Sequence, residues 1–204
     1  MPNPLRRVKM VRSAIEQEFP GLSNSRWYLK SPKSTKYQCI GWAACESHRK
    51  WWPWDWPRHL YPPEVYWPAH LPVGDESIQN FVNAFVDELG YESCGRNEEF
   101  EFGYQKIAIY AKIANGADKT KHMARQHLLG RGWLSKLGGN VDILHASLRD
   151  LEGDLYGKVE QVLRRSWRTA FSKGLALPSS FRFLLYRLRH PSWIVSNLKR
   201  RFLA

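Results

Sequence analysis

The change in hydrophobic periodicity near the middle of the chain constrains the fold most strongly. Residues 75–90 (DESIQNFVNAFVDELG) place apolar side chains at helical spacing, with Asp75 or Ser77 available as the N-cap and Gly90 after the last apolar residue. Residues 105–113 (QKIAIYAKI) are almost continuously apolar, which is typical of a central strand. The pattern therefore predicts helices followed by a sheet, which is an α+β fold.

The flanking segments extend this pattern. Short helices are predicted over residues 11–19 and 39–49, and Pro53 prevents the second helix from continuing. Strands are predicted over residues 121–129 and 133–139, joined by a turn that contains two glycines. We therefore expect N-terminal helices packed on a small antiparallel sheet.

The positive charge is concentrated at the C-terminal end. The chain carries a net charge of +12, and residues 158–204 hold eleven Lys or Arg and one acidic residue. Two further helices are predicted there, over residues 179–190 and 193–203, with Arg interleaved with Phe, Tyr, Trp and Leu. This composition suits binding to nucleic acid or to an anionic membrane surface. The alternative is a pair of helices that pack on the core and expose their charged side to solvent.

The sequence suggests three parts. They are an N-terminal helix and loop (1–36), a core domain (37–160) and a basic, helical C-terminal extension (161–204). The chain has three cysteines, no apolar leader segment and no stretch long enough to span a membrane, so we expect free thiols and a cytoplasmic protein. Delivery as an effector, by export that needs no such leader, stays open.

Cys39 is the candidate nucleophile. It stands where a helix is predicted to begin, and a helix N-terminus and a nearby imidazolium both favour the thiolate. His122 precedes a glycine turn and a polar strand that can bring a residue to orient the imidazole. The alternatives are a buried structural cysteine and a structural histidine. A metal site with His59 and His70 is disfavoured by their irregular spacing, and no cofactor is expected.

Six motifs carry a resemblance to a known family. In chain order they are QCIGWA, YQKIAIYA, KHMARQ, GRGWLSKLGG, DILHASL and LYGKV. Together they resemble papain-like cysteine hydrolases of the NlpC-like and CHAP-like kind. They are most similar to an uncharacterised bacterial family with Asn-Cys-x-Ala-Trp-Ala, His-x-Ala-Arg and Trp-x-Ser-Lys-x-Gly motifs. The resemblance covers roughly residues 35–160 and excludes the basic C-terminal segment.

The resemblance implies a catalytic set. It assigns the nucleophile to Cys39, the base to His122 and the third, orienting position to Ser135, with Asp142 and His145 as rivals for that position. Papain-like enzymes usually have Asn, Asp, Glu or His at the third position. Gln38 stands where the similar family has Asn, and its amide could donate to an oxyanion.

The tryptophan-rich segment that follows the Cys39 helix has two interpretations. Trp42, Trp52 and Trp54 could line a substrate cleft for an extended peptide or glycan. Residues 50–73 also hold many prolines, so the aromatic rings could simply pack an irregular loop.

We therefore expect a cysteine hydrolase, a peptidase or amidase, acting on a peptide, amide or acyl substrate through a Cys-His pair. The alternative is a non-enzymatic interaction protein with a degenerate papain-like core and a basic tail that binds nucleic acid or an anionic membrane.

Overall fold

A seven-stranded antiparallel sheet forms the centre of the molecule. The computed structural model describes residues 4–114 and 116–176. The strand order is β1-β8-β7-β6-β5-β9-β4, and every neighbouring pair is antiparallel. The strands are β1 (Trp27–Leu29), β4 (Glu92–Ser93), β5 (Tyr104–Ala114), β6 (Ala117–Gln126), β7 (Trp133–Lys136), β8 (Asp142–His145) and β9 (Lys158–Ser166). The α+β class is confirmed, and the sheet is larger than the small one expected.

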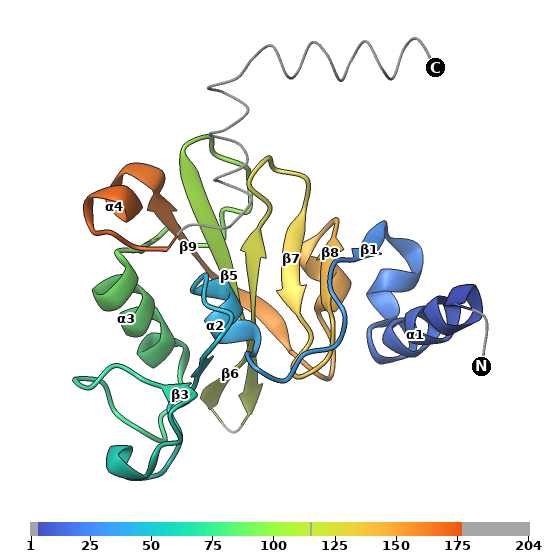
Figure 1. Ribbon diagram of the computed structural model, residues 1–204. Coiled ribbons are helices and arrows are strands. Elements are labelled where there is room, and N and C mark those ends of the chain that lie inside the picture. Colours follow the sequence, from blue (N-terminus) through green and yellow to red (C-terminus); the bar gives the residue numbers. More distant parts are fainter. Residues whose placement is uncertain (1–3, 115, 177–204) are drawn as a thin grey trace.

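Helices and short elements surround the sheet. The α-helices are α1 (Pro4–Glu18), α2 (Cys39–Ala43), α3 (Ile78–Leu89) and α4 (Trp167–Ser172). Three 3₁₀ turns are η1 (Pro20–Asn24), η2 (Arg58–Leu60) and η3 (Leu148–Leu151), and β2 (Lys50–Trp51) pairs with β3 (Val65–Tyr66) as a parallel two-stranded ribbon. Figure 1 shows α2 lying across the middle of the large sheet, with α3 beside it and α1 next to the β1 edge.

Two hydrophobic cores lie on the two faces of the sheet. Side chains alternate along β5, so that Ala108 and Tyr110 belong to one core while Ile107 and Ile109 belong to the other. We call the first the α1-side core, because it contains Ile15 of α1. The second is the α2-side core, and its main members from the helices and the tryptophan-rich segment are Cys39, Ile40, Trp51, Trp67, Phe81 and Phe85. The sheet is therefore covered on both faces.

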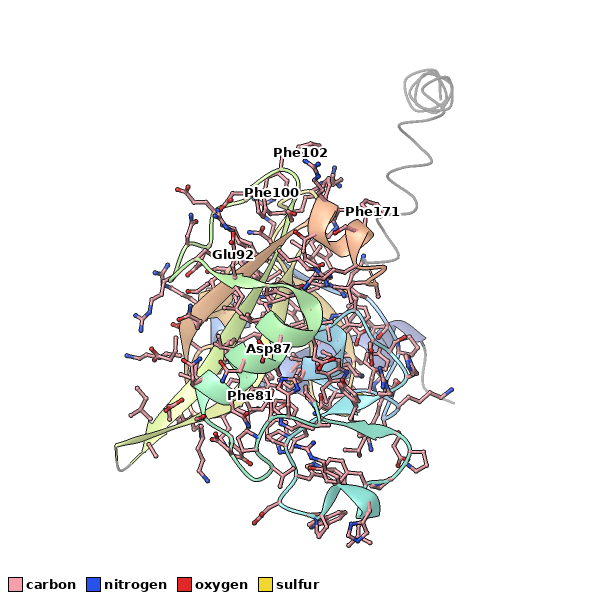
Figure 2. The ribbon with its side chains drawn as sticks, turned by 90° about the vertical axis from the view of Figure 1, so that its left-hand side faces the viewer. Phe81, Asp87, Glu92, Phe100, Phe102 and Phe171 are labelled. Carbon is pink, nitrogen blue, oxygen red and sulfur yellow. The ribbon has the colours of Figure 1, made fainter. Side chains whose placement is uncertain are left out.

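Helix α3 covers the α2-side core much as its sequence predicts. Ser77 caps its N-terminus through Asn80 N–H, and Gly90 ends it in the left-handed conformation, with φ of 68°. Figure 2 shows α3 in front of the sheet, with Phe81 and Asp87 labelled along it. Phe81 is fully buried and meets Trp52 and Trp67 edge-on, which ties the tryptophan-rich segment to the helix.

The observed elements differ from the predicted segments in several places. The helix predicted over 39–49 ends at Ala43, because Cys45 adopts φ of 67° and leaves the helical path. Strand β9 pairs with β5 from Lys158 to Ser166 and so runs across the expected domain boundary at residue 160. The segment 1–36 is part of the core, because it supplies strand β1. The helices predicted over 179–190 and 193–203 lie outside the described residues.

A glycine controls the packing of β9 against β5. Gly157 has φ of 79°, and a Cβ atom there would lie 2.0 Å from the carbonyl oxygen of Ala111. Gly95 has a similar φ of 64° but open space around it. The two positions therefore share the backbone strain of a non-glycine residue and differ in steric room.

We predict that Gly157→Ala lowers the free energy of unfolding by about 3 kcal/mol or more, because strain and overlap add. Gly95→Ala, the matched control, should cost only about 1 kcal/mol. Urea unfolding of both variants measures the difference, and equal losses would contradict the steric argument.

Candidate active site

Helix α2 begins at Cys39 because Gln38 caps it. The side-chain oxygen of Gln38 accepts hydrogen bonds from the N–H groups of Ile40 and Gly41, at 3.1 and 3.3 Å. Its amide nitrogen donates to the carbonyl oxygen of Trp51 at 2.8 Å. The amide oxygen and one amide hydrogen are thus used to start the helix and to hold β2. Gln38 serves here as a cap, a role different from the oxyanion donor that the resemblance implied.

The Cys39 thiol is almost buried, with 6% of the residue exposed. Burial raises its pKa to about 11, although hydrogen bonding from the backbone of Met123 and the positive charge of Lys136 act in the opposite direction. The thiol is therefore protonated near neutral pH. The helix N-terminus alone does not produce a resting thiolate.

His122 lies in a buried chain of hydrogen bonds. Its Nε2 is 3.0 Å from Ser135 Oγ, which is 2.9 Å from His145 Nε2, and His145 Nδ1 is 2.7 Å from the carbonyl oxygen of Ser147. His122, Ser135 and His145 are all fully buried. The expected contact between His122 and Ser135 is present, and His145 joins it as a third member. We call this chain the histidine relay.

The direction of the relay follows from its last member. A carbonyl oxygen can only accept, so Nδ1 of His145 carries the proton and Nε2 of His145 is an acceptor. Ser135 then donates to His145 and accepts from Nε2–H of His122. The remaining nitrogen, His122 Nδ1, is left with a free lone pair, and it is buried with no hydrogen-bond partner among the described residues. Burial lowers the pKa of both His122 and His145, so both imidazoles are neutral.

Tyr156 holds the His122 ring in place. The two rings stack in parallel, with centroids 4.1 Å apart and planes at 3°. Tyr110 meets the same imidazole edge-on at 5.3 Å. From sequence Tyr156 is only a packing tyrosine beside a turn, since nothing in the local pattern shows that it will meet His122.

Alternation along the strands puts the relay on the α1 side of the sheet. Ala124 and Ser135 are direct partners across β6 and β7, and Ala124 belongs to the α1-side core. Met123, the residue after His122, belongs instead to the α2-side core with Cys39. The candidate nucleophile and the candidate base thus approach the sheet from opposite faces.

The thiol and the imidazole are nevertheless neighbours along the backbone of β6. Cys39 interacts with the backbone of Met123, and β6 begins seven residues before Ala124, the first of its residues to pair with β7. Tyr156, which stacks on His122, also interacts electrostatically with Cys39. No hydrogen bond joins Cys39 to His122 in the described part of the chain.

Asp142, a rival for the third position, lies elsewhere. Its carboxylate accepts from Tyr37 Oη at 2.8 Å and is 3.6 Å from Nζ of the fully buried Lys136. Lys136 also lies 4.8 Å from the centroid of the Tyr37 ring and interacts electrostatically with Cys39. Among the three candidates for the imidazole partner, Ser135 makes the contact, His145 lies one step further, and Asp142 pairs with Lys136.

The three tryptophans proposed to line a cleft do not lie together, because Trp42 packs on Tyr37 while Trp52 and Trp54 line a separate pocket. Trp42 stacks on Tyr37 at 5.6 Å, and the Arg125 guanidinium lies 4.4 Å from its ring centroid. Trp52 and Trp54 line a pocket of about 320 Å³, together with Pro53, Asp55, Trp56, Gly74 and Glu76. Trp52 also packs on Phe81, so this ring contributes to the core as well as to the pocket wall, and a role in substrate binding stays a prediction.

Metal ligands are not assembled in the described residues. These contain no group of three His, Cys, Asp or Glu side chains placed to hold a metal ion. His59, His70 and His122 therefore do not form the set considered from sequence. Within residues 4–114 and 116–176, no helix combines the length and apolar character needed to cross a membrane.

Fold and site together define an α+β protein with a thiol at the start of a helix on one face of the sheet and a buried histidine relay on the other. The chain belongs to the family described as Domain of unknown function (DUF7689), whose model matches residues 28–164. The match runs from β1 into β9 and includes Cys39, His122, Ser135 and His145. No curated protein and no solved structure matches the chain.

We predict that the relay makes the fold sensitive to acid. Burial lowers the pKa of His145 from 6.5 to about 4, so its contribution to stability is complete above pH 6.5 and is lost as the pH falls towards 4. The loss should approach about 3 kcal/mol for this residue. Chemical unfolding between pH 7 and pH 4 measures it, with His145→Gln as the control that should flatten the profile.

Proposed function

We propose that this protein is a cysteine hydrolase that cleaves an amide or ester bond, with Cys39 as nucleophile and His122 as general base. The observation that carries the proposal is the free lone pair on His122 Nδ1, which the relay leaves on the one ring nitrogen that has no partner among the described residues. An unprotonated ring nitrogen with a free lone pair is what a general base requires.

The resting state is a neutral pair. The pKa of Cys39 is raised to about 11 and that of His122 is lowered by burial, so neither group is charged near pH 7. The proton would therefore move from Sγ to Nδ1 as sulfur attacks the carbonyl carbon, as in serine enzymes, where the base acts during the attack. His122 would then protonate the leaving amine or alcohol, and water would hydrolyse the thioester.

Ser135 and His145 would act as positioning residues. They hold the proton of His122 on Nε2, which keeps Nδ1 unprotonated until the nucleophile gives up its proton. Lys136 is the group best placed to stabilise the developing oxyanion, because it is the charged side chain that interacts with Cys39 and Gln38 is used as the cap.

Substrate class is narrowed only by the surroundings of the site. Cys39 is 6% exposed, whereas His122 and the rest of the relay are fully buried. A substrate would therefore reach the sulfur from the solvent side of α2, and the Trp52–Trp54 pocket would bind a more distant part of an extended peptide, amide or acyl substrate. An anionic partner bound through residues 158–204 stays a prediction, since residues 177–204 lie outside the described part.

We predict that Cys39→Ser abolishes hydrolysis of p-nitrophenyl esters and of fluorogenic peptide amides while the free energy of unfolding changes by less than about 1 kcal/mol. Mass spectrometry of the wild-type protein, quenched during ester turnover, should find the acyl group on Cys39. Cys94→Ser is the control variant and should keep full activity. Hydrolysis that survives Cys39→Ser would overturn the proposal.

We also predict that Ser135→Ala changes the pH profile as well as the rate. Without the hydroxyl, the tautomer of His122 is no longer fixed, so kcat should fall by about tenfold to 10⁴-fold. The removal also leaves buried nitrogen atoms unpaired, so stability should fall by about 1–3 kcal/mol. Activity measured where the variant is fully folded separates the two effects, and an unchanged pH profile would contradict the positioning role.

A further inference from the structure

The other end of α2 carries a second thiol in an unusual setting. Cys45 follows the last turn of the helix and has φ of 67°, a conformation that usually belongs to glycine. Its sulfur is 3.2 Å from Nε2 of Gln105 and 3.2 Å from Nη1 of Arg125. Both neighbours are N–H donors, so the sulfur is surrounded as a hydrogen-bond acceptor.

The orientation of Gln105 is fixed by a third residue. Its amide oxygen accepts from Nη2 of Arg165 at 3.0 Å, so its NH₂ group must face Cys45. The hydrogen bond from Arg165 therefore determines that the NH₂ group of Gln105, and not its oxygen, faces the sulfur of Cys45. A thiolate accepts such hydrogen bonds far better than a thiol does.

The buried positive charge near Cys45 also favours an anion at this position. Arg125 and Arg165 are only 4% and 1% exposed. Their guanidinium groups donate to backbone carbonyl oxygens, to the side chain of Gln105 and to the sulfur of Cys45. Neither guanidinium pairs with a carboxylate in the described part of the chain. The remaining residues, 1–3, 115 and 177–204, include no Asp or Glu. Buried cations without a counter-charge are strongly unfavourable, and a Cys45 thiolate would supply one negative charge.

Two buried donors near Cys45 are still unused. The hydroxyl group of Tyr91 and Nε of Arg125 have no hydrogen-bond partner among the described residues. Tyr91 is 3% exposed and interacts electrostatically with Cys45, Arg125 and Arg165, so its hydroxyl belongs to the same cluster. Burial raises the pKa of Tyr91, which keeps the phenol protonated and able to donate. Together these donors suit one added oxygen atom, which needs no large pocket.

We propose that Cys45 is a redox-sensitive thiolate, held by Arg125 and Gln105, that a peroxide oxidises to a sulfenate. The sulfur lone pair attacks one peroxide oxygen, the O–O bond breaks, and hydroxide leaves. The hydroxide takes the remaining hydrogen from the new S–OH group, so thiolate and hydrogen peroxide give sulfenate and water. Sulfur loses two electrons and peroxide gains them. The sulfenate oxygen is then available to the Tyr91 hydroxyl and to Arg125 Nε–H.

The other two thiols provide an internal comparison. Burial raises the pKa of Cys39 and of Cys94, and the Cys94 sulfur lies against the carbonyl oxygens of Asn97 and Val162, which cannot donate to it. Carbonyl acceptors face the Cys94 sulfur, backbone N–H groups face the buried Cys39 sulfur, and side-chain donors that include a guanidinium face the Cys45 sulfur. Cys45 should be oxidised first.

The decisive experiment treats the full chain with a small excess of hydrogen peroxide at neutral pH, traps sulfenate with a 1,3-dione, and maps adducts by mass spectrometry. We expect Cys45 to carry at least tenfold more adduct than Cys39 or Cys94. Equal labelling of the three thiols, or labelling mainly at Cys39, would overturn the proposal. Because adducts are read directly, the result does not depend on whether the protein is a hydrolase.

Variants then test the donors. Cys45→Ser should remove the adduct, and Arg125→Lys should lower its rate of formation about tenfold, because one charge-assisted hydrogen bond is lost. Gln105→Asn provides a second test that leaves Arg125 in place, since the shorter side chain withdraws its amide from the sulfur. Unchanged rates in the variant that folds would overturn the role of the donors. Ser93→Ala, a change on β4, is the surface control and should keep the wild-type rate.

Discussion

The carbonyl oxygen of Ser147 fixes the direction of every hydrogen bond in the buried chain that runs through His145, Ser135 and His122. Because it can only accept, each following group has one allowed role. The result is an imidazole whose Nδ1 is unprotonated and has no hydrogen-bond partner within residues 4–114 and 116–176. Ser147 is itself held, since Asp150 accepts from its N–H while the Ser147 side chain caps η3. The tautomers of His145 and His122 thus depend on a short turn beyond the end of β8.

Strands β5 and β6 act as a partition between two environments. On one side, Tyr156 stacks on the His122 ring and Tyr110 meets it edge-on. The other side holds the buried Lys136, whose charge is balanced by Asp142. Alternation along the strands forces adjacent residues into these different surroundings. Beside Met123, β6 pairs with β5 but extends beyond its pairing with β7.

Helix α2 carries a thiol at each end, and the two thiols differ for electrostatic reasons. At the N-terminus, burial outweighs the nearby N–H groups and Lys136, so Cys39 is protonated. At the C-terminus, Arg125 and the amide of Gln105 face the sulfur of Cys45. Helix position alone therefore does not predict the surroundings of each thiol, because the side chains that face Cys45 come from β5 and β6.

Sequence alone determined the elements that depend on local patterns. Helix α3 and strand β5 follow from apolar periodicity, and the Cys39 helix start follows from the residues around it. The contact between His122 and Ser135 was expected from the resemblance of the motifs that contain them, on strands joined by a glycine turn. Only the tertiary structure decided that His145 extends this contact, that Asp142 pairs with Lys136, and that Tyr156 stacks on His122. It also decided that Arg125 and the amide of Gln105 donate to the sulfur of Cys45. These contacts join residues far apart in the chain, and they depend on strand register and on which face each side chain takes, which no local pattern encodes.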